Sequence, residues 1–317
     1  MKYLLIGLLF LLGCSGRIHE ESPHIVSQKK KVRFIINPCS GQGKTQHLAS
    51  RISRKFHPKH CEYDIYLTKG RGDATLLANE AVDMGYDVVV AVGGDGTVNE
   101  VGKALINTST ALAIIPRGSG NGFARSLKIP SQIDAALKIL ARGHMLNIDT
   151  MTINDTPFLG VAGTGFDALI GHKFADLEKR GPAAYVKLIN EEYKEYVPEH
   201  YTLEIDGAPY DTDAFMITFA NTNQYGNNLL IDPLAKVDDG SFELVMISEF
   251  PQWAIPELVL RLFGGQIDRS PYTETKSCKQ VTLKGKEHLV HLDGEPHHFH
   301  EELKVQIHPH TLNVVVP

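Results

Sequence analysis

The stretch VVVAVGGDGTVNE, residues 88–100, decides the fold of the N-terminal half of the chain. Residues 88–92 are β-branched or small and wholly apolar, which is typical of a parallel strand that is buried on both faces. Gly93 and Gly94 then permit a sharp turn, and Thr97 can cap a following helix. The stretch therefore predicts a buried strand, a tight loop and a helix that starts near Thr97.

The same alternation of strand and helix continues on both sides of this stretch. Strand-like runs occupy residues 32–36, 62–67 and 111–115, and apolar residues recur at helical intervals over residues 45–56 and 73–84. This alternation predicts a parallel sheet with helices on both faces, which is a doubly wound α/β domain. Ligands of such sheets bind at the loops that leave the carboxyl ends of the strands.

Beyond about residue 146 the chain becomes rich in strand-like runs with turn residues between them. Helical segments at residues 182–196 and 253–263 interrupt these runs. The pattern predicts an antiparallel β-sandwich after the α/β domain, with a ligand cleft between the two. We place the α/β domain at residues 31–147 and the β-rich domain at residues 148–317, whose last strands can return to the first domain. The strand-like runs are residues 148–153, 158–162, 201–205, 214–220, 242–247, 280–283, 289–292, 303–307 and 312–316.

The composition is that of a folded globular protein and argues against a nucleic-acid partner. Of the 317 residues, 43% are hydrophobic and 22% are charged, and the formal net charge is −5. Nucleic-acid-binding proteins usually carry a basic surface, which this charge does not favour. The four cysteines are widely scattered and form no C-x-x-C pair, which argues against a disulfide framework or a zinc site and favours a reducing compartment.

Residues 1–30 are interpreted as a hydrophobic leader and a polar linker. Leu-Leu-Gly-Cys at residues 11–14 is similar to a bacterial lipobox, in which the cysteine, here Cys14, is lipidated after cleavage. The apolar run before it is shorter than the roughly 20 residues that a transmembrane helix needs. Three interpretations stay open: a cleaved lipoprotein leader, a short membrane anchor and a mis-assigned start codon.

Two further glycine-rich loops follow strands of the predicted parallel sheet. The first, NPCSGQGKT at residues 37–45, is similar to a Walker A loop, but Pro38 stands where that motif needs its first glycine. A phosphate site and a structural turn therefore both remain open for this loop alone. The other, PRGSGNGFAR at residues 116–125, offers the Arg117 guanidinium and the polar groups of Ser119 and Asn121 to a phosphate.

Asp95 is the acidic residue of the central loop, and its carboxylate can hold a magnesium ion or accept a proton. Glycine lets backbone N–H groups approach phosphate oxygens, and the start of a helix adds a favourable dipole. Three such loops at one edge of a sheet make a nucleotide phosphate site the simplest interpretation.

Together, the motifs Asn-Pro-x-Ser-Gly, Gly-Gly-Asp-Gly-Thr-x-Asn-Glu and Pro-x-Gly-Ser-Gly-Asn, in this order, resemble the diacylglycerol kinase catalytic-domain family. That family includes soluble bacterial diacylglycerol kinases and the sphingosine and ceramide kinases. The resemblance covers the chain from about Lys31 to the C-terminus. It implies a first domain like those of NAD kinase and phosphofructokinase, ATP and Mg²⁺ as cofactors, and a membrane lipid as the phosphate acceptor.

The resemblance also implies which residues bind the nucleotide. They lie in the first and central loops, in the segment after the second strand and in the third loop. The positions are Asn37, Pro38, Cys39, Ser40, Gly41, Thr68, Gly93, Gly94, Asp95, Gly96, Thr97, Asn99, Glu100 and Ser119.

In the second half of the chain, VHLDGE at residues 290–295 matches the x-Asp-Gly-Glu motif of the family. The resemblance implies that Glu295 is the proton acceptor and that Asp293 supports it, with Asp95 as the third catalytic residue. A plain β-turn with two acidic residues is the alternative interpretation of this segment taken alone. Residues 163–167, GTGFD, match a segment of the family that lines the cleft.

The segment PLAKVDDGS, residues 233–241, matches a structural magnesium loop of the family. The resemblance implies that Asp239 supplies a carboxylate and that Lys236 and Ser241 supply backbone carbonyls. Hard oxygen ligands of this kind are those that magnesium prefers.

The expected reaction is transfer of the ATP γ-phosphate to a lipid hydroxyl, with diacylglycerol giving phosphatidic acid as the first expectation. Bacterial members usually carry Asn-Asp-Phe in the third loop, whereas this chain has Asn-Gly-Phe at residues 121–123. The lost carboxylate leaves a sphingoid base or ceramide as the alternative acceptor. A soluble-substrate kinase of the NAD-kinase type and a non-catalytic nucleotide- or lipid-binding regulator are remoter alternatives.

The expected location follows from the two substrates. Access to a lipid favours peripheral or anchored membrane association, and ATP requires the cytoplasmic face of that membrane. Export as a lipoprotein through Cys14 is the competing expectation, and a homodimer is compatible with the sequence.

Overall fold

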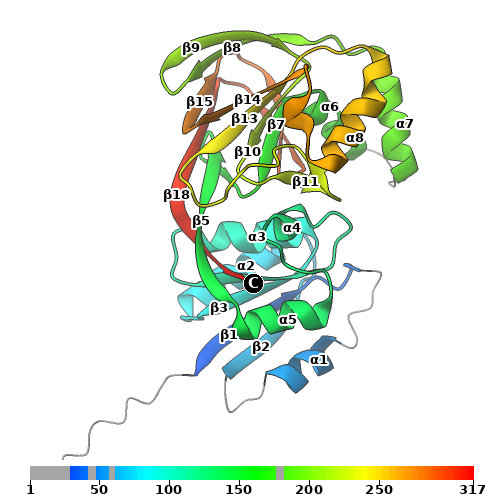
Figure 1. Cartoon of the computed structure of the whole chain (residues 1–317). Helices are drawn as coiled ribbons and strands as arrows, with labels where there is room; N and C mark the ends of the chain where they lie inside the picture. The colour runs from blue at the N-terminus through cyan, green and yellow to red at the C-terminus, as the bar shows by residue number, and fades with distance from the viewer. Residues whose placement is uncertain (1–28, 42–47, 57–60, 176–181) are drawn as a thin grey trace, which may run out of the picture.

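The computed structural model describes residues 29–41, 48–56, 61–175 and 182–317, and Figure 1 shows a β-rich domain above an α/β domain. The leader and the part of the first loop from residue 42 to residue 45 lie outside the described residues.

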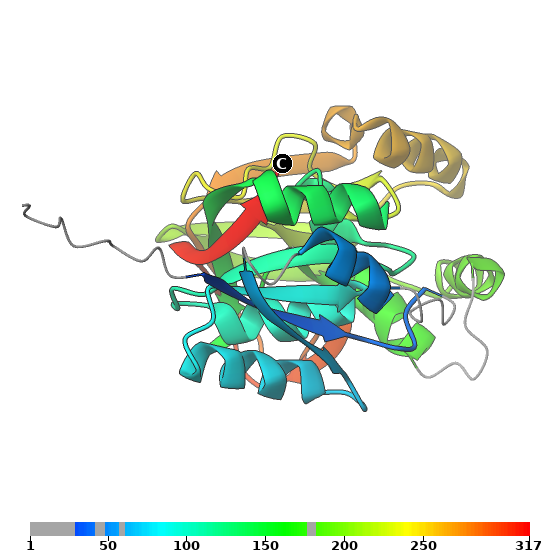
Figure 2. The ribbon, with the colours of Figure 1, turned by 90° about the horizontal axis from the view of Figure 1, so that it is seen from below.

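Four parallel strands form the centre of the α/β domain. Their order is β2-β1-β3-β4, and the central strand β3 is buried along its whole length, as its apolar sequence predicts. Helices α2 and α3 pack against each other on one face of the sheet, while α1 and α5 lie together on the other face (Figure 2). The predicted doubly wound arrangement is confirmed. The elements are β1 (Lys30–Ile36), α1 (Leu48–Lys55), β2 (Cys61–Leu67), α2 (Asp73–Asp83), β3 (Val88–Gly93), α3 (Asp95–Leu105), β4 (Ala111–Pro116) and α5 (Ile133–Arg142).

The long strand β18 (Leu303–Val316) joins the two domains. It pairs with β4 in parallel through Val314 and Leu112, and it pairs with β5 (His144–Ile153) in the antiparallel sense. The sheet then continues through β15 (Gln280–Leu283), β8 (Glu199–Ile205) and β9 (Ala208–Ala214). The two separate runs that the sequence indicates here are one strand with an irregularity between His308 and Leu312.

A second, antiparallel sheet completes the β-rich domain. Its strand order is β14-β13-β10-β7-β16-β17, and it packs on the extended part of the first sheet around Phe158, Phe219 and Phe242, which are fully buried. The predicted antiparallel sandwich is confirmed. The strands are β7 (Val161–Gly165), β10 (Met216–Ala220), β13 (Phe242–Ile247), β14 (Thr273–Cys278), β16 (His288–Leu292) and β17 (Glu295–Phe299).

Short helices and strands complete the structure, and α7 and α8 form the predicted helical insertions. Within the described residues, no helix is long and apolar enough to cross a membrane. These elements are α4 (Gly122–Ser126), β6 (Thr156–Phe158), α6 (Phe166–Ala175), α7 (Pro182–Glu192), β11 (Gln224–Gly226), β12 (Leu229–Leu230), η1 (Gln252–Ala254), α8 (Ile255–Gly264) and η2 (Ile267–Arg269).

Candidate active site

The central glycine loop connects β3 to α3 by a turn that has no room for side chains. A Cβ atom at Gly93 would lie 2.5 Å from the Cβ atom of Thr97, closer than real Cβ contacts. Helix α3 therefore begins at Asp95, two residues before the predicted start near Thr97. Its first backbone N–H groups point to the carboxyl edge of the sheet, where they can receive an anion.

The third loop packs directly on the central loop and holds Asp95. The N–H of Arg117 donates to the carbonyl of Gly93 at 2.7 Å, and the N–H of Asn121 donates to Asp95 Oδ2 at 2.8 Å. A Cβ atom at Gly118 would lie 2.7 Å from the Cα atom of Gly94, so glycine is needed for this approach. The two loops form one rigid wall on which the Asp95 carboxylate is oriented.

The first loop joins the same wall through its asparagine. Asn37 Nδ2 donates to Thr97 Oγ1 at 3.3 Å, and Asn37 Oδ1 accepts from the N–H of Cys39 at 2.9 Å. The Arg117 guanidinium donates to the carbonyl of Gly41 at 3.2 Å, which ties the first loop to the third. The structure thus brings the three glycine-rich loops together, with Cys39 and Ser119 exposed.

The side chain of Glu100 has a structural contact that the motif did not indicate. Its Oε1 accepts from the N–H of Gly72 at 3.0 Å, and its Oε2 accepts from the N–H of Ala74 at 3.1 Å. The carboxylate therefore caps the N-terminus of α2, where a negative charge is favourable. Thr68, another predicted nucleotide-binding residue, begins the segment that leads to this cap, and its N–H donates to the carbonyl of Ile36 at 2.9 Å.

Asp293 connects the two domains. It occupies the tight turn between β16 and β17 with φ of 51°, and Gly294 follows with φ of 81°, as a two-residue hairpin turn requires. Its carboxylate accepts backbone N–H bonds of 2.8 to 3.1 Å from residues 159–161. With the Asn99 amide oriented for hydrogen bonding, Asn99 Nδ2 of α3 lies 3.0 Å from Asp293 Oδ2. Removal of this carboxyl from water raises its pKa, and the N–H of Leu159 opposes that effect.

Glu295 begins the strand that leaves this turn. Its carboxylate lies 3.2 Å from the guanidinium of Arg71, which belongs to the α/β domain, and 30% of its side chain is exposed. The ion pair therefore spans the two domains beside Gly294, which lines the cavity described next.

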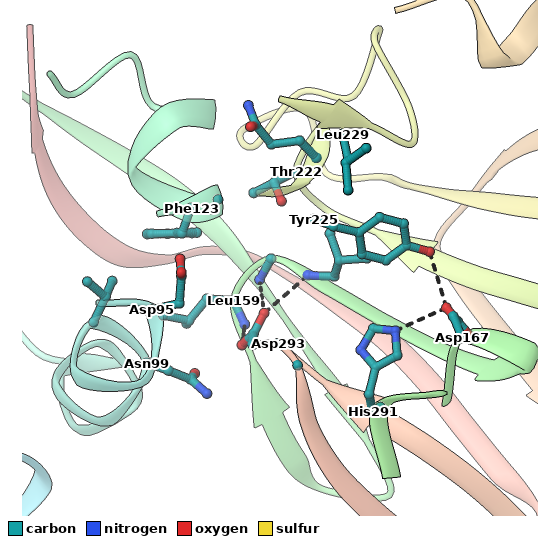
Figure 3. Close-up of a pocket in the computed structure, with 17 residues that line it drawn as sticks. Asp95, Asn99, Phe123, Leu159, Asp167, Thr222, Tyr225, Leu229, His291 and Asp293 are labelled. Atoms are coloured by element: carbon teal, nitrogen blue, oxygen red, sulfur yellow. Dashed lines mark hydrogen bonds and ion pairs between the residues drawn. The ribbon is translucent and has the colours of Figure 1, made fainter. Parts of the chain in front are cut away.

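A cavity of about 490 Å³ lies between the domains, and Asp95 lines one of its walls (Figure 3). The volume is in the range of small-molecule sites. The lining residues are Asp95, Val98, Asn99, Gly122, Phe123, Leu159, Gly160, Val161, Asp167, Gly171, Thr222, Gln224, Tyr225, Leu229, His291, Asp293 and Gly294.

The opposite wall carries a hydrogen-bonded cluster of Asp167, His291 and Tyr225. Asp167 Oδ2 accepts from Tyr225 Oη at 3.1 Å and lies 3.1 Å from His291 Nε2 (Figure 3). His291 is 6% exposed, and its Nδ1 has no hydrogen-bond partner among the described residues. A Cβ atom at Gly163 would lie 2.9 Å from His291 Nε2, so this glycine makes room for the cluster.

Asp167 lies in the predicted cleft-lining segment, residues 163–167, whereas His291 and Tyr225 were not among the predicted site residues. His291 belongs to strand β16, directly before the turn that holds Asp293, and the x-Asp-Gly-Glu motif does not specify which wall of the cavity its side chain joins. Tyr225 comes from the short strand β11, and no pattern in the sequence pointed to it.

Gly122, where the chain departs from the usual Asn-Asp-Phe, lies against the β-rich domain. A Cβ atom at this position would lie 2.7 Å from the carbonyl oxygen of Tyr225. The absence of a side chain therefore lets α4 of the first domain contact β11 of the second.

The candidate magnesium loop is held by a buried carboxylate. Asp149 is fully buried, and its carboxylate accepts from the N–H of Gly240 at 2.7 Å and from the N–H of His310 at 2.8 Å. Asp239 Oδ1 accepts from the N–H of Ser241 at 3.1 Å and from its hydroxyl at 2.9 Å. Lys236, in the same loop, is exposed.

Comparisons with known proteins match both domains. Residues 31–153 match the model of the diacylglycerol kinase catalytic domain, and residues 160–316 match that of the YegS C-terminal NAD kinase beta sandwich-like domain. The chain is 28% identical to a diacylglycerol kinase of Staphylococcus saprophyticus over 272 residues, which cover 84% of this chain and 89% of that protein. It is 29% identical to a diacylglycerol kinase of Staphylococcus aureus over 84% of this chain and 86% of that protein.

The fold is also that of a solved structure. The crystal structure of a diacylglycerol kinase from Bacillus anthracis superimposes with a TM-score of 0.71 at 23% identity, covering 92% of this chain and 98% of that one. At this identity the likeness shows the fold alone. The two domain matches together span nearly all of the described residues, and the chain thus combines a diacylglycerol kinase catalytic domain with a YegS C-terminal NAD kinase beta sandwich-like domain.

Proposed function

We propose that this chain is a lipid kinase that transfers the γ-phosphate of ATP to the hydroxyl of diacylglycerol and so forms phosphatidic acid. One observation carries the proposal: a single cavity has the Asp95 loop on one wall and the polar cluster of the β-rich domain on the other (Figure 3). Such a cavity can receive a phosphate donor from one domain and an acceptor from the other. The names of the Staphylococcus relatives support diacylglycerol as that acceptor.

The glycine loops are proposed to bind the phosphates of ATP. Backbone N–H groups and the N-terminus of α3 favour negative charge at this edge, and phosphoryl transfer needs mainly positioning and charge stabilisation. The fit of Asp95 to a magnesium ion rests on its chemistry, since it is a carboxylate at the cavity wall whose direction is set by the N–H of Asn121. Magnesium, when bound, neutralises charge on the transferred phosphoryl group.

On the acceptor side, Glu295 is proposed to receive the proton of the lipid hydroxyl. Its ion pair with Arg71 must open for this, because the carboxylate has to come within hydrogen-bond reach of the hydroxyl. Asp293 is proposed to position Glu295 through the hairpin turn, since its own oxygens are engaged by backbone N–H groups. The cluster of Asp167, His291 and Tyr225 is proposed to contact the lipid headgroup.

The loop of Lys236, Asp239 and Ser241 is proposed to hold a structural magnesium ion. Its support is the donor set, one carboxylate and backbone carbonyls, together with the fixed loop conformation that Asp149 imposes. For the whole chain we propose membrane association at the cytoplasmic face, because the reaction needs both a membrane lipid and ATP.

A radiolabelled-ATP assay with the purified chain tests the function. The acceptors are diacylglycerol, monoacylglycerol, sphinganine, ceramide and NAD, and the Asp95→Asn variant serves as the control for contaminating kinases. We expect label in phosphatidic acid with the wild type and its loss with the variant. Label in NAD alone, or in no acceptor despite ATP binding, would contradict the proposal, and label in sphinganine or ceramide would move it to the alternative acceptor.

A further inference from the structure

Helix α8 and the turn before it expose an unusual number of large apolar side chains. Trp253 is 73% exposed, Leu260 71% and Phe263 53%, and Val259 is also exposed. Single exposed apolar residues are common on proteins, but a group of this size within 11 residues marks a surface that meets something other than water.

The spacing along α8 puts these side chains on one outward side. Val259, Leu260 and Phe263 are one, three and four residues apart, which places them on one side of a helix, whereas Leu258 points inward and is buried. The helix is thus apolar on its outer side as well as on the side that packs against the protein, which is unusual for a helix in water. Figure 2 shows α8 projecting from the body of the molecule.

Helix α8 packs next to one wall of the cavity. Helix α8 packs on β12, and Leu229 of β12 lines the cavity wall. At the C-terminal end of the helix, a Cβ atom on Gly265 would lie 3.1 Å from Leu230 Cδ1, so the helix end and β12 are in close contact. Strand β12 therefore contacts α8 and also contributes to the cavity wall.

We propose that the apolar surface formed by Trp253 of η1 and by Val259, Leu260 and Phe263 of α8 docks the protein on the surface of a lipid bilayer. The inference rests on the proposed function, since a kinase for a membrane lipid has to reach an acceptor that stays in the bilayer. Tryptophan and large aliphatic side chains suit the boundary between headgroups and acyl chains. Arg261, paired with Glu257 at 2.8 Å, leaves little net charge along the helix, so the attraction is mainly apolar.

The chain carries its own reporter, because Trp253 is the only tryptophan in the sequence. Full-length protein is titrated with vesicles of phosphatidylcholine and with vesicles that also contain phosphatidylglycerol, without ATP. We expect a blue shift of tryptophan emission and quenching by lipids brominated on the acyl chains, as Trp253 leaves water. Binding should persist at high salt, because apolar burial is not screened.

The matched variants are Leu260→Asp with Phe263→Asp on α8, and Leu76→Asp on α2 as the control. Leu76 is 68% exposed, close to Leu260, but lies on the α/β domain. We expect the α8 variant to weaken vesicle binding by about tenfold or more, because charged groups resist entry into the apolar boundary, and the control to bind like the wild type. Circular dichroism and thermal unfolding check that both variants are folded.

Two substrates separate this inference from the proposed function. With long-chain diacylglycerol in vesicles the α8 variant should turn over much more slowly than wild type, whereas with a short-chain diacylglycerol dispersed as monomers the two should be equal. Equal rates on vesicles, or an unchanged Trp253 spectrum, would overturn docking while leaving the kinase intact. No phosphorylation of either substrate by wild type would overturn the kinase, and the fluorescence would still decide docking. A dimer that only the α8 substitutions dissociate, without a vesicle effect, would assign this surface to a second copy instead.

Discussion

The guanidinium of Arg71 lies 3.2 Å from the carboxylate of Glu295, and this ion pair joins the α/β domain to the β-rich domain beside the cavity. The residue that the proposed mechanism needs as a proton acceptor is therefore paired with a basic residue of the other domain. Because Arg71 is largely exposed, the pair can open at small cost when a substrate enters.

Replacing Glu295 by Gln should lower kcat by about 100-fold or more, because the amide cannot accept the proton of the hydroxyl. Nucleotide affinity, measured by fluorescence or calorimetry, should stay unchanged, since the glycine loops are untouched. Glu192→Gln is the matched control, because Glu192 also pairs with a basic residue, Lys173, at 2.6 Å within the β-rich domain. Full lipid phosphorylation by the Glu295→Gln variant would remove Glu295 from the proposed mechanism.

Asp95 and Glu100 belong to one motif, but substitution of Asp95 should reduce activity whereas substitution of Glu100 should reduce stability. Asp95→Asn should keep the fold, because its side-chain carbonyl can still accept from Asn121, and should lower kcat by about 100-fold or more through loss of the charge on the phosphoryl side. Glu100→Gln should lower the free energy of unfolding by about 1 kcal/mol through the weakened cap of α2. Steady-state kinetics and urea unfolding on both variants measure the difference, and equal kinetic losses would refute it.

The polar cluster should act on the lipid rather than on ATP. His291→Leu removes the imidazole that contacts Asp167 at the cavity wall, so we expect KM for diacylglycerol to rise about tenfold while KM for ATP is unchanged. Tyr225→Phe should have a smaller effect of the same kind, because the ring and the His291–Asp167 contact remain. If only KM for ATP changed, the lipid headgroup would not bind at this cluster.

Restoring the aspartate that the family usually carries, by Gly122→Asp, should destabilise this chain. The Cβ atom would lie 2.7 Å from the Tyr225 carbonyl oxygen, and overpacking of this kind costs about 1–3 kcal/mol. Thermal unfolding measures the loss, with Gly207→Ala as a control in an exposed turn where a Cβ atom meets nothing within 4 Å but φ is positive. A Gly122→Asp variant as stable as wild type would contradict this clash and would show that β11 moves to make room for the side chain. The acceptor preference of that variant would then be compared with that of the wild type.

His288, which is buried, and His297, which is partly buried, should make the fold sensitive to acid. Burial lowers the pKa of His288 and of His297 below the ordinary value of 6.5. The unfolded chain therefore binds more protons than the folded chain as the pH falls through about 6.5, and the free energy of unfolding decreases there. The raised pKa of Asp293 acts in the opposite sense and favours the folded state at low pH.

Thermal unfolding between pH 8 and pH 5 should show a falling midpoint, and the His288→Phe variant should show a shallower fall if it folds. The His297→Asn variant removes the titrating group at a half-exposed position. Its unfolding midpoint should also fall less steeply with decreasing pH than that of the wild type. A midpoint that is independent of pH in the wild type would contradict the burial of these neutral rings.

Local sequence determined most of the fold and one wall of the site. The apolar run and the two glycines within residues 88–100 are compatible only with a buried strand, a tight turn and a helix. Strand β3 and helix α3 therefore follow from short-range chemistry. The Asp-Gly pair at residues 293–294 likewise specifies its hairpin turn, because a two-residue turn needs positive φ at both positions. These features depend on residues that are close together in the chain, so they can be predicted from the sequence.

Contacts between distant segments decided the rest. The motif predicts Glu100 as a nucleotide ligand, and only the fold shows that its carboxylate caps the N-terminus of α2. The second motif predicts Glu295 as a base, and only the fold shows that Arg71 of the other domain contacts it. The cluster of His291, Asp167 and Tyr225 gathers three elements that are separated by 58 to 124 residues, and no local pattern encodes their meeting. Contacts between helix α6, strand β16 and the short strand β11 bring these residues together, which is why only the tertiary structure shows the proposed acceptor wall of the cavity.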